Sequence, residues 1–504
     1  MANTFLNNLK TATNYTRTEN GAITHKSTLN SLLDMFAMGG AYRKRCDEDI
    51  ILLFKKALAE DEVYALKCLF YLRDVRGGQG ERRFFKVCMK WLAKEQPKIA
   101  RRNLKSIPEY GRWDDLYVFV GTPLEQDALN FMKNQFALDL LSLEKPNQGV
   151  SLLGKWLKSC NASSRETKRL GNITRIAFGM TQKEYRKTLA ELRDRINIVE
   201  KLMSENRWDE IEFDKIPSKA GLIYKNAFAR RDIIAQKYEA FANDKSTTVN
   251  AKTLYPQEIA TKAFHNFDSY PSINRAMLQK YWDNLPNYYG DREENGIAVV
   301  DVSGSMYGTP LAAAVSLGAY IADKAHGPFA NHFITFSADP KLVQFSGVDI
   351  VEKFNRCSSA DWGMNTNIEK VFDLLLSTAL KNKTPQKDMP ERLYIFSDME
   401  FDECITSEGS SDCSWHNRNN HLDRNGIDTL IETISKKWLS YGYKMPSIVF
   451  WNLDARQNNI PAIGDGFSYV SGFAPVMIEQ ILSGKDGIAL MLEKLDSERY
   501  TAIK

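Results

Sequence analysis

Residues 297–300 are four consecutive apolar residues that lead directly into Asp301. A continuous apolar run of this kind predicts a strand buried on both faces, as in a parallel sheet with helices above and below it. Ser303 and Ser305 follow Asp301 at alternate positions, so three oxygen-bearing side chains can point toward one spot. Because a buried carboxylate needs a compensating partner and hard divalent cations prefer oxygen ligands, this stretch predicts a cation site at the end of a buried strand.

The chain has 504 residues, of which 43% are hydrophobic and 26% are charged. These values are typical of a soluble globular protein, and the length allows two or three domains. No apolar run approaches the length of a membrane span, and residues 1–9 lack the basic start and apolar core of a signal peptide. The seven cysteines are scattered singly, which favours reduced thiols in an intracellular, cytoplasmic protein without membrane contact.

Charge is distributed unevenly along the chain. Residues 1–290 hold 47 lysines and arginines against 34 aspartates and glutamates, whereas residues 291–504 hold 20 against 29. The first part therefore carries an excess of 13 positive charges, which suggests a separate basic domain with a polyanion such as RNA as its partner. The alternative is a mildly basic helical domain whose charge has no function.

Three regions differ in their sequence pattern. Residues 1–46 are polar, which predicts an N-terminal arm that is poorly ordered or only partly tied down. Apolar residues then recur at helical spacing across 47–290, with breaks at proline and glycine. Successive helices with short links indicate an all-helical domain, a curved or closed HEAT-like array of helix pairs, although no fixed-length repeat is present. A polar link at 284–296 marks the boundary with the last domain, 291–504.

From residue 297 the pattern changes to alternating strands and helices. Strands are expected at 297–302, 332–336, 342–345, 393–397, 447–451 and 467–470. Helices are expected at 310–325, 367–380, 425–440 and 474–482. This order predicts a doubly wound, Rossmann-like α/β domain, in which ligands bind beyond the carboxyl ends of the strands.

Two further oxygen-bearing residues are expected at the same edge of this sheet. Asp398 ends the fourth strand, and Thr366 lies in the loop before the helix at 367. The pattern Asp-x-Ser-x-Ser, followed by a loop threonine and a strand-end aspartate, resembles the metal-ion-dependent adhesion site (MIDAS) of von Willebrand factor A (vWA) domains. The resemblance covers about residues 296–483.

The vWA resemblance implies a role for each of these five residues. Ser303, Ser305 and Thr366 would be direct hydroxyl ligands of a divalent cation, with Mg²⁺ as the default. Asp301 and Asp398 would hold the cation partly through water. Neutral hydroxyl ligands leave the charge of the cation largely uncompensated, so the carboxylate of a protein partner would be attracted to the vacant position.

The sequence also departs from the adhesion-site pattern. Met399 follows Asp398 where the vWA family often has glycine, and the next residue, Glu400, could compete for the open position. Asn365 and Asn367 are rivals of the loop threonine as a ligand. The alternative to a working site is a domain that has kept the fold and lost the metal.

A second stretch, residues 73–83, places three glycines between arginines just before a helix. Glycine allows close approach of a ligand, and a helix N-terminus with arginines can hold a phosphate, although no P-loop motif is present. The arginines proposed to contact RNA phosphates are Arg73, Arg76, Arg82, Arg83, Arg101 and Arg102. The alternative is a helix–helix turn whose arginines pair with Asp74, Glu81 or the Asp114–Asp115 pair.

Two families share these features. A basic helical domain followed by a vWA-like domain is the layout of the Ro ribonucleoproteins, whose ring-shaped TROVE domain binds small noncoding RNA and the ends of misfolded RNA. An uncharacterised family of phages, large DNA viruses and plants (domain of unknown function 2828) resembles the chain more closely. It is similar at residues 73–83, at residues 111–116 and in the adhesion-site motif, which also makes a virion location an expectation.

These features favour a non-enzymatic, Ro-like binding protein. Its helical TROVE-like domain would bind RNA, and its vWA domain would bind a protein partner through the cation. The alternative is an interaction or assembly module, for example a viral structural protein, that uses the metal site without binding RNA. A metal-dependent hydrolase ranks last, because a single cation with hydroxyl ligands and no nearby general base is a poor generator of hydroxide.

Overall fold

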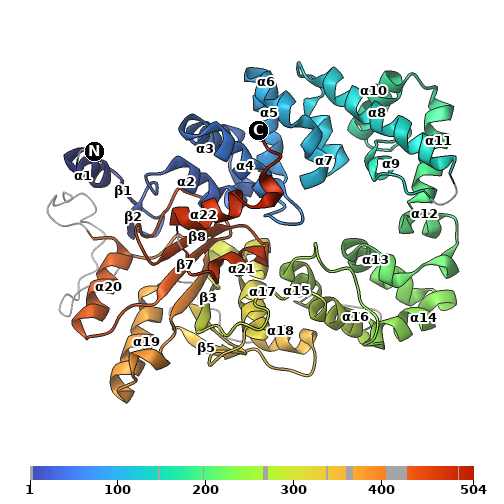
Figure 1. The fold of residues 1–504 in the computed structure, drawn as a ribbon. Helices are drawn as coiled ribbons and strands as arrows, with labels where there is room; N and C mark the ends of the chain where they lie inside the picture. The colour runs from blue at the N-terminus through green and yellow to red at the C-terminus, as the bar shows by residue number, and fades with distance from the viewer. Residues whose placement is uncertain are drawn as a thin grey trace. The chain divides into compact units, whose positions relative to one another are not determined.

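A computed structural model gives the fold (Figure 1). It describes the chain except for residues 1–3, 146–147, 197, 265–270, 337–338, 359–366, 404–427 and 486. The chain divides into two compact units, which are called the sheet unit and the helical unit below. The sheet unit comprises Met1–Cys46, Tyr255–Phe264 and Asn287–Lys494, and the helical unit comprises Asp47–Leu254, His265–Pro286 and Leu495–Lys504. Among the described residues, no helix is long and apolar enough to cross a membrane.

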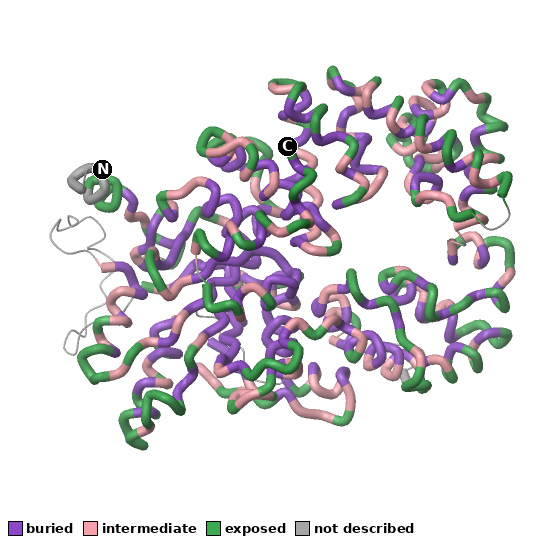
Figure 2. Tube along the Cα trace, viewed as in Figure 1, coloured by how far each residue is buried: buried purple, intermediate pink, exposed green. Residues whose placement is uncertain are grey.

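The sheet unit is built on a six-stranded sheet with the order β5-β4-β3-β6-β7-β8. Its strands are β3 (Gly296–Asp301), β4 (His332–Phe336), β5 (Lys341–Gln344), β6 (Arg392–Ser397), β7 (Ser447–Asn452) and β8 (Phe467–Ser471). Only the pairing of β5 with β4 is antiparallel among these strands, and the other four pairings are parallel. The mainly parallel sheet predicted from the apolar run at 297–300 is confirmed, and every residue of β3 is buried (Figure 2).

Helices pack on this sheet and on one another. The helices of the unit after β3 are α17 (Thr309–Lys324), α18 (Ile350–Ser358), α19 (Glu369–Asn382), α20 (Leu430–Ser440), α21 (Ile478–Ile481) and α22 (Gly487–Leu495). Helix α17 contacts β3, β4 and β6, so it covers the centre of the sheet. Helix α15 (Pro256–Phe264) packs against α17 and α18, although the sequence pattern had placed it in the helical domain.

The N-terminal arm is part of the sheet unit. It contains α1 (Thr4–Thr13), a hairpin of β1 (Tyr15–Arg17) and β2 (Ile23–His25), and α2 (Ser31–Met38). Helix α2 packs on β8. The turn of the hairpin binds the segment that follows β6, because Thr18 Oγ1 donates to the Phe401 carbonyl at 2.7 Å and Asn20 Nδ2 donates to the Glu400 carbonyl at 2.6 Å.

The helical unit begins with α3 and is confirmed as a succession of helices. Its helices are α3 (Asp47–Glu60), α4 (Glu62–Arg73), α5 (Arg83–Glu95), α6 (Pro97–Asn103), α7 (Ile107–Tyr110), α8 (Glu125–Leu143), α9 (Leu153–Trp156), α10 (Arg165–Phe178), α11 (Gln182–Arg195), α12 (Val199–Ser204), α13 (Ser218–Arg230), α14 (Asp232–Asn243) and α16 (Pro271–Asp283). Neighbours in the sequence pack as pairs, for example α3 with α4 and α13 with α14. Helix α5 has an amphipathic pattern that buries Phe84, Phe85 and Leu92.

Residues 495–504 return to the helical unit and pack on the turn after α4. The ring of Tyr500 stacks on that of Tyr110 with 5.7 Å between the centroids. The guanidinium group of Arg499 donates to both carboxylate oxygens of Asp74, and Tyr500 Oη donates to the same carboxylate at 3.1 Å. Aromatic and charged contacts therefore join residues 495–504 to the turn after α4 and to α7.

Candidate metal site and basic cluster

The centre of the sheet contains a topological switch point. From β3 the chain continues to β4 and β5 on one side, and it then crosses to β6 on the other side of β3. Ligands of doubly wound sheets bind at such a point, in the crevice beyond the carboxyl ends of the strands. Asp301 is the last residue of β3, and Asp398 directly follows β6, so the two aspartates flank this point.

Hydrogen bonds join the candidate ligands into one group. The Asp301 Oδ1 atom accepts a hydrogen bond of 2.9 Å from the Ser303 amide. The Ser303 and Ser305 hydroxyl oxygens are 3.0 Å apart, and Ser305 Oγ donates to Asp398 Oδ2 at 2.7 Å. The structure thus brings these four predicted ligands together, whereas Thr366 lies outside the described residues.

The two carboxylates of this group are buried, so their ionised forms need a nearby positive charge to be stable. Asp301 is fully buried and Asp398 is 1% exposed. Burial, together with the charge of Asp398, raises the pKa of Asp301 to about 7. Two buried carboxylates and two hydroxyls form an all-oxygen donor set, which fits Mg²⁺ or Ca²⁺. The described part of the chain contains no group of three or more His, Cys, Asp or Glu residues that could hold a metal ion. The candidate site is of a different kind, because two of its four donors are serine hydroxyls.

Three neighbours of the site were missed in the sequence. Ser397 Oγ donates to Asp301 Oδ2 at 2.6 Å. An Arg456 guanidinium nitrogen donates to Asp398 Oδ2 at 2.9 Å, and the other terminal nitrogen lies 2.6 Å from a carboxylate oxygen of Glu19 in the arm. Arg456 follows β7, the strand beside β6, so the rule that ligands gather at carboxyl ends could have indicated it. No feature of the sequence could have indicated Glu19, because its contact with Arg456 depends on how the N-terminal arm folds.

The structure describes Met399 and Glu400, the two residues after Asp398 that depart from the adhesion-site pattern, whereas Asn365 lies outside the described residues. Met399 has φ of 66°, the left-handed conformation that glycine adopts most readily. Glu400 Oε2 accepts a hydrogen bond of 2.8 Å from the Glu19 amide, whereas its Oε1 atom is buried and has no hydrogen-bond partner. Burial is the main cause that raises the pKa of Glu400 to about 7.

The arginines predicted to contact RNA are engaged with carboxylates or carbonyls of the helical unit. Arg73 is 1% exposed and donates to Asp115 Oδ2 at 2.9 and 2.6 Å, and Arg82 bridges Asp114 and Asp115. The remaining pairs are Arg76 with Glu109, Arg83 with Asp47, Arg101 with Asp127 and Arg102 with Glu62. The buried position of Arg73 corrects its assignment as a phosphate contact, because its guanidinium group already has a buried partner.

The glycine-rich turn between α4 and α5 is folded back on the end of α4. The amides of Gln79, Gly80 and Glu81 donate to the carbonyls of Tyr71, Asp74 and Leu72, respectively. A Cβ atom on Gly78 would lie 1.9 Å from the Tyr71 carbonyl oxygen. Because these amides are bound within the protein, the turn requires glycine for close packing rather than for a phosphate cradle.

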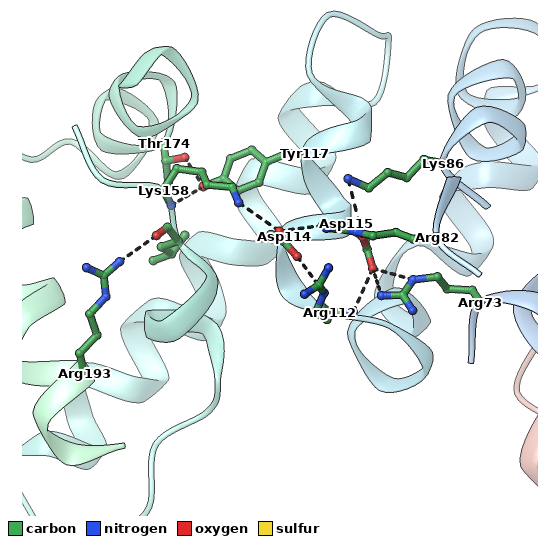
Figure 3. Close-up of polar contacts among 11 residues, drawn as sticks. Arg73, Arg82, Lys86, Arg112, Asp114, Asp115, Tyr117, Lys158, Thr174 and Arg193 are labelled. Carbon is green, nitrogen blue, oxygen red and sulfur yellow. Dashed lines mark hydrogen bonds and ion pairs between the residues drawn. The ribbon is translucent and has the colours of Figure 1, made fainter. Parts of the chain in front are cut away.

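An ion-pair network surrounds the two adjacent aspartates of residues 111–116 (Figure 3). Besides Arg73 and Arg82, three cationic side chains approach the Asp114 and Asp115 carboxylates. Lys86 is 3.8 Å from Asp115, Arg112 is 3.6 Å from Asp114 and Lys158 is 3.0 Å from Asp114. Burial raises the pKa of both aspartates, but the surrounding cations outweigh burial and hold each pKa below its usual value.

Comparison with known families assigns most of the chain. The family described as Domain of unknown function (DUF2828) matches residues 18–139 and 157–287, which together make half of the chain. The chain belongs to this family. A second family, Domain of unknown function (DUF7788), matches residues 295–500 of this DUF2828 protein. The family membership expected from residues 73–83 and 111–116 is confirmed.

Two individual proteins are similar over nearly the whole chain. "Uncharacterized protein L728" of Acanthamoeba polyphaga mimivirus is 29% identical over 513 residues, covering 94% of the DUF2828 chain and 85% of the viral protein. The crystal structure of the Deinococcus radiodurans RO (RSR) protein matches with a TM-score of 0.47 and 13% identity, covering 94% of this chain and 100% of the other. The expectation of a viral relative is confirmed.

Proposed function

We propose that this protein is a non-enzymatic binding protein whose sheet unit holds a divalent cation, most simply Mg²⁺, in a vWA-like adhesion site. The observation that carries the proposal is the hydrogen-bonded group of Asp301, Ser303, Ser305 and Asp398 at the switch point of the sheet. Thr366 would complete the ligand set, as the vWA resemblance implies.

The donor set favours binding of an anionic partner. Serine hydroxyls are neutral ligands, so a cation held by Ser303 and Ser305 keeps much of its positive charge. Ser305 is also only half-buried, which gives an incoming group access to the hydroxyl side of the site. The proposed partner is a protein that presents an aspartate or glutamate side chain to the cation.

The test uses the full chain and Mg²⁺. Calorimetric titration should detect one Mg²⁺ site, and Asp301→Asn should abolish it, because the change removes the charge of a buried ligand while preserving its shape. Asp388→Asn is the matched control, since Asp388 is exposed on a short helical turn away from the group. Unchanged Mg²⁺ binding by Asp301→Asn would overturn the assignment of the site.

The acidic partner is tested separately with peptides. Immobilised peptides that each contain one aspartate or glutamate should bind the protein in the presence of Mg²⁺. They should release the protein when a chelator removes the cation. Matched peptides with asparagine or glutamine should not bind. If chelation leaves peptide binding unaltered, the cation has a structural role instead.

RNA binding by the helical unit is the second proposed function. It rests on the excess of 13 positive charges in residues 1–290 and on the half-exposed cations around Asp114 and Asp115. Phosphate contacts release counterions, so affinity for single-stranded RNA should fall steeply as salt is raised. An affinity insensitive to salt would contradict this function, whereas survival of RNA binding in Asp301→Asn would show that the two functions are independent.

A further inference from the structure

Five cationic side chains converge on two carboxylates within the helical unit (Figure 3). They are Arg73 at the end of α4, Arg82 and Lys86 at the start of α5, Arg112 before the Asp114–Asp115 pair, and Lys158 after α9. Three positive charges in this group therefore lack a carboxylate within the group. The four cations other than Arg73 are called the basic cluster below.

The members of the basic cluster reach solvent, whereas the carboxylates do not. The side chains of Arg82, Lys86, Arg112 and Lys158 are 27–34% exposed, and those of Asp114 and Asp115 are at most 5% exposed. The aspartates thus hold the cations from the protein side. The outer side of the cations is open to a ligand of opposite charge.

The cations of the cluster repel one another, and this repulsion adds to the cost of their burial. Burial and the nearby charge of Arg82 lower the pKa of Lys86, and the same two causes lower the pKa of Arg112. The Lys86 ammonium nitrogen lies 3.8 Å from Asp115 Oδ1, beyond hydrogen-bonding distance, and among the described residues no carboxylate lies closer. An anion placed among these cations would relieve the repulsion and offer Lys86 an acceptor within hydrogen-bonding distance.

An aromatic ring lies against one cation of the cluster, and the same ring lines a cavity. The Arg112 guanidinium carbon lies 4.4 Å from the ring centroid of Trp156, a cation–π arrangement. Trp156 also lines a cavity of about 550 Å³ together with Ser159, Asn161 and Arg186. Single-stranded nucleic acids are bound by this combination of cations for the backbone and aromatic rings for the bases.

We propose that Arg82, Lys86, Arg112 and Lys158 form a subsite for a phosphate group of single-stranded RNA. This inference rests on the proposed RNA binding and names where one phosphate is held. The phosphate oxygens accept hydrogen bonds from the outer side of the four cations, and a neighbouring base lies toward Trp156. Asp114 and Asp115 fix the cations in place before the ligand arrives.

The test compares Lys86→Gln with Lys90→Gln in the full chain. Both lysines are on α5, one turn apart, and Lys90 is exposed outside the cluster. Removing Lys86 relieves repulsion, so the thermal midpoint of the ligand-free Lys86→Gln variant should stay equal or rise. Binding of a labelled single-stranded RNA should weaken, and the slope of log K against log salt should become shallower by about 0.7, the value for one phosphate contact on a single strand. Lys90→Gln should retain the slope of the unchanged protein.

A second experiment with inorganic phosphate tells whether the subsite binds a free phosphate or a phosphate of RNA. It also tells whether the subsite or the RNA function has failed. Phosphate should raise the thermal midpoint of the unchanged protein and of Lys90→Gln, but not that of Lys86→Gln. If phosphate behaves in this way and RNA does not bind, the subsite holds a small phosphate and the RNA function fails. If RNA binds and both variants respond alike, the RNA function survives and the subsite is overturned. An unfolded Lys86→Gln protein would also overturn it, because Lys86 would then be structural.

Discussion

Ser305 Oγ donates a hydrogen bond of 2.7 Å to Asp398 Oδ2, although the two residues are 93 positions apart in the sequence. The same carboxylate oxygen accepts from the Arg456 guanidinium group at 2.9 Å. A hydroxyl and a cationic side chain thus meet at one oxygen of the proposed metal site.

Ser305→Ala should weaken Mg²⁺ binding at least about tenfold, because it removes a proposed ligand oxygen and leaves the fold intact. Ser305 is half-buried, and among the described residues its hydroxyl bonds only to Ser303 and Asp398, so little stability should be lost. Calorimetric titration measures the affinity. Ser377→Ala, which removes an exposed hydroxyl on α19, is the control and should bind as the unchanged protein does. Equal affinities in the two variants would exclude Ser305 as a ligand.

Arg456→Ala should strengthen Mg²⁺ binding about tenfold, since a hydrogen bond between charged groups is worth roughly 1.5–3 kcal/mol and the guanidinium group competes for Asp398. Without metal, the variant should unfold at a lower temperature, because Asp398 loses its cationic partner. Lys44→Ala is the matched control. Lys44 pairs with Asp454, two residues from Arg456, so it changes the local charge without touching Asp398. A similar gain in affinity from Lys44→Ala would indicate a general charge effect instead of competition at one oxygen.

Asp115→Asn should destabilise the helical unit by roughly 3–5 kcal/mol at pH 7, because it leaves the buried Arg73 without its charged partner. Asp127→Asn, which breaks the exposed pair with Arg101, should cost less than about 1 kcal/mol. Thermal unfolding of the full chain measures both changes. Equal losses would contradict a special role for the buried pair.

The same aspartate gives the stability a defined pH dependence. The pKa of Asp115 in the folded protein lies below its usual value, so the unfolded state binds the proton more readily. Its contribution is therefore present above about pH 4, the unfolded pKa, and is lost as pH falls further. The unchanged protein should lose stability as pH falls below about 4, whereas Asp115→Asn should show a flatter profile there. Parallel profiles would mean that Asp115 does not titrate with folding.

The sheet could be predicted from the sequence because each strand is indicated by a short run of neighbouring residues. The apolar run before Asp301 indicates a strand that is buried on both faces, and strand-end positions in a doubly wound sheet share one edge. Asp301 and Asp398 could therefore be placed together without coordinates. The same rule applied to the loop after β7 could have indicated Arg456.

Other parts of the site depend on contacts between distant segments. Glu19 reaches Arg456 only because the turn of the β1–β2 hairpin hydrogen-bonds to residues 400–401, and the polar composition of the arm carries no sign of this pairing. The cations around Asp114 come from three separate segments of the chain, so spacing could suggest partners for Arg73 and Arg82 but not for Lys158. The return of Arg499 to Asp74 is equally non-local.

Gly78→Ala should destabilise the helical unit by about 3 kcal/mol or more, whereas Gly77→Ala should cost about 1 kcal/mol. A Cβ atom at position 78 would meet the Tyr71 carbonyl oxygen at 1.9 Å, and that oxygen is held in place by the Gln79 amide. At position 77 the nearest atom is Arg499 Cδ at 2.9 Å, a side-chain atom that can shift by a few tenths of an ångström more easily than a backbone carbonyl in a helix. Thermal unfolding of the two variants measures the difference, with the unchanged protein as reference. If both substitutions cost the same, the turn tolerates a side chain over α4, and its glycines would have to serve a ligand rather than the packing of the helical unit.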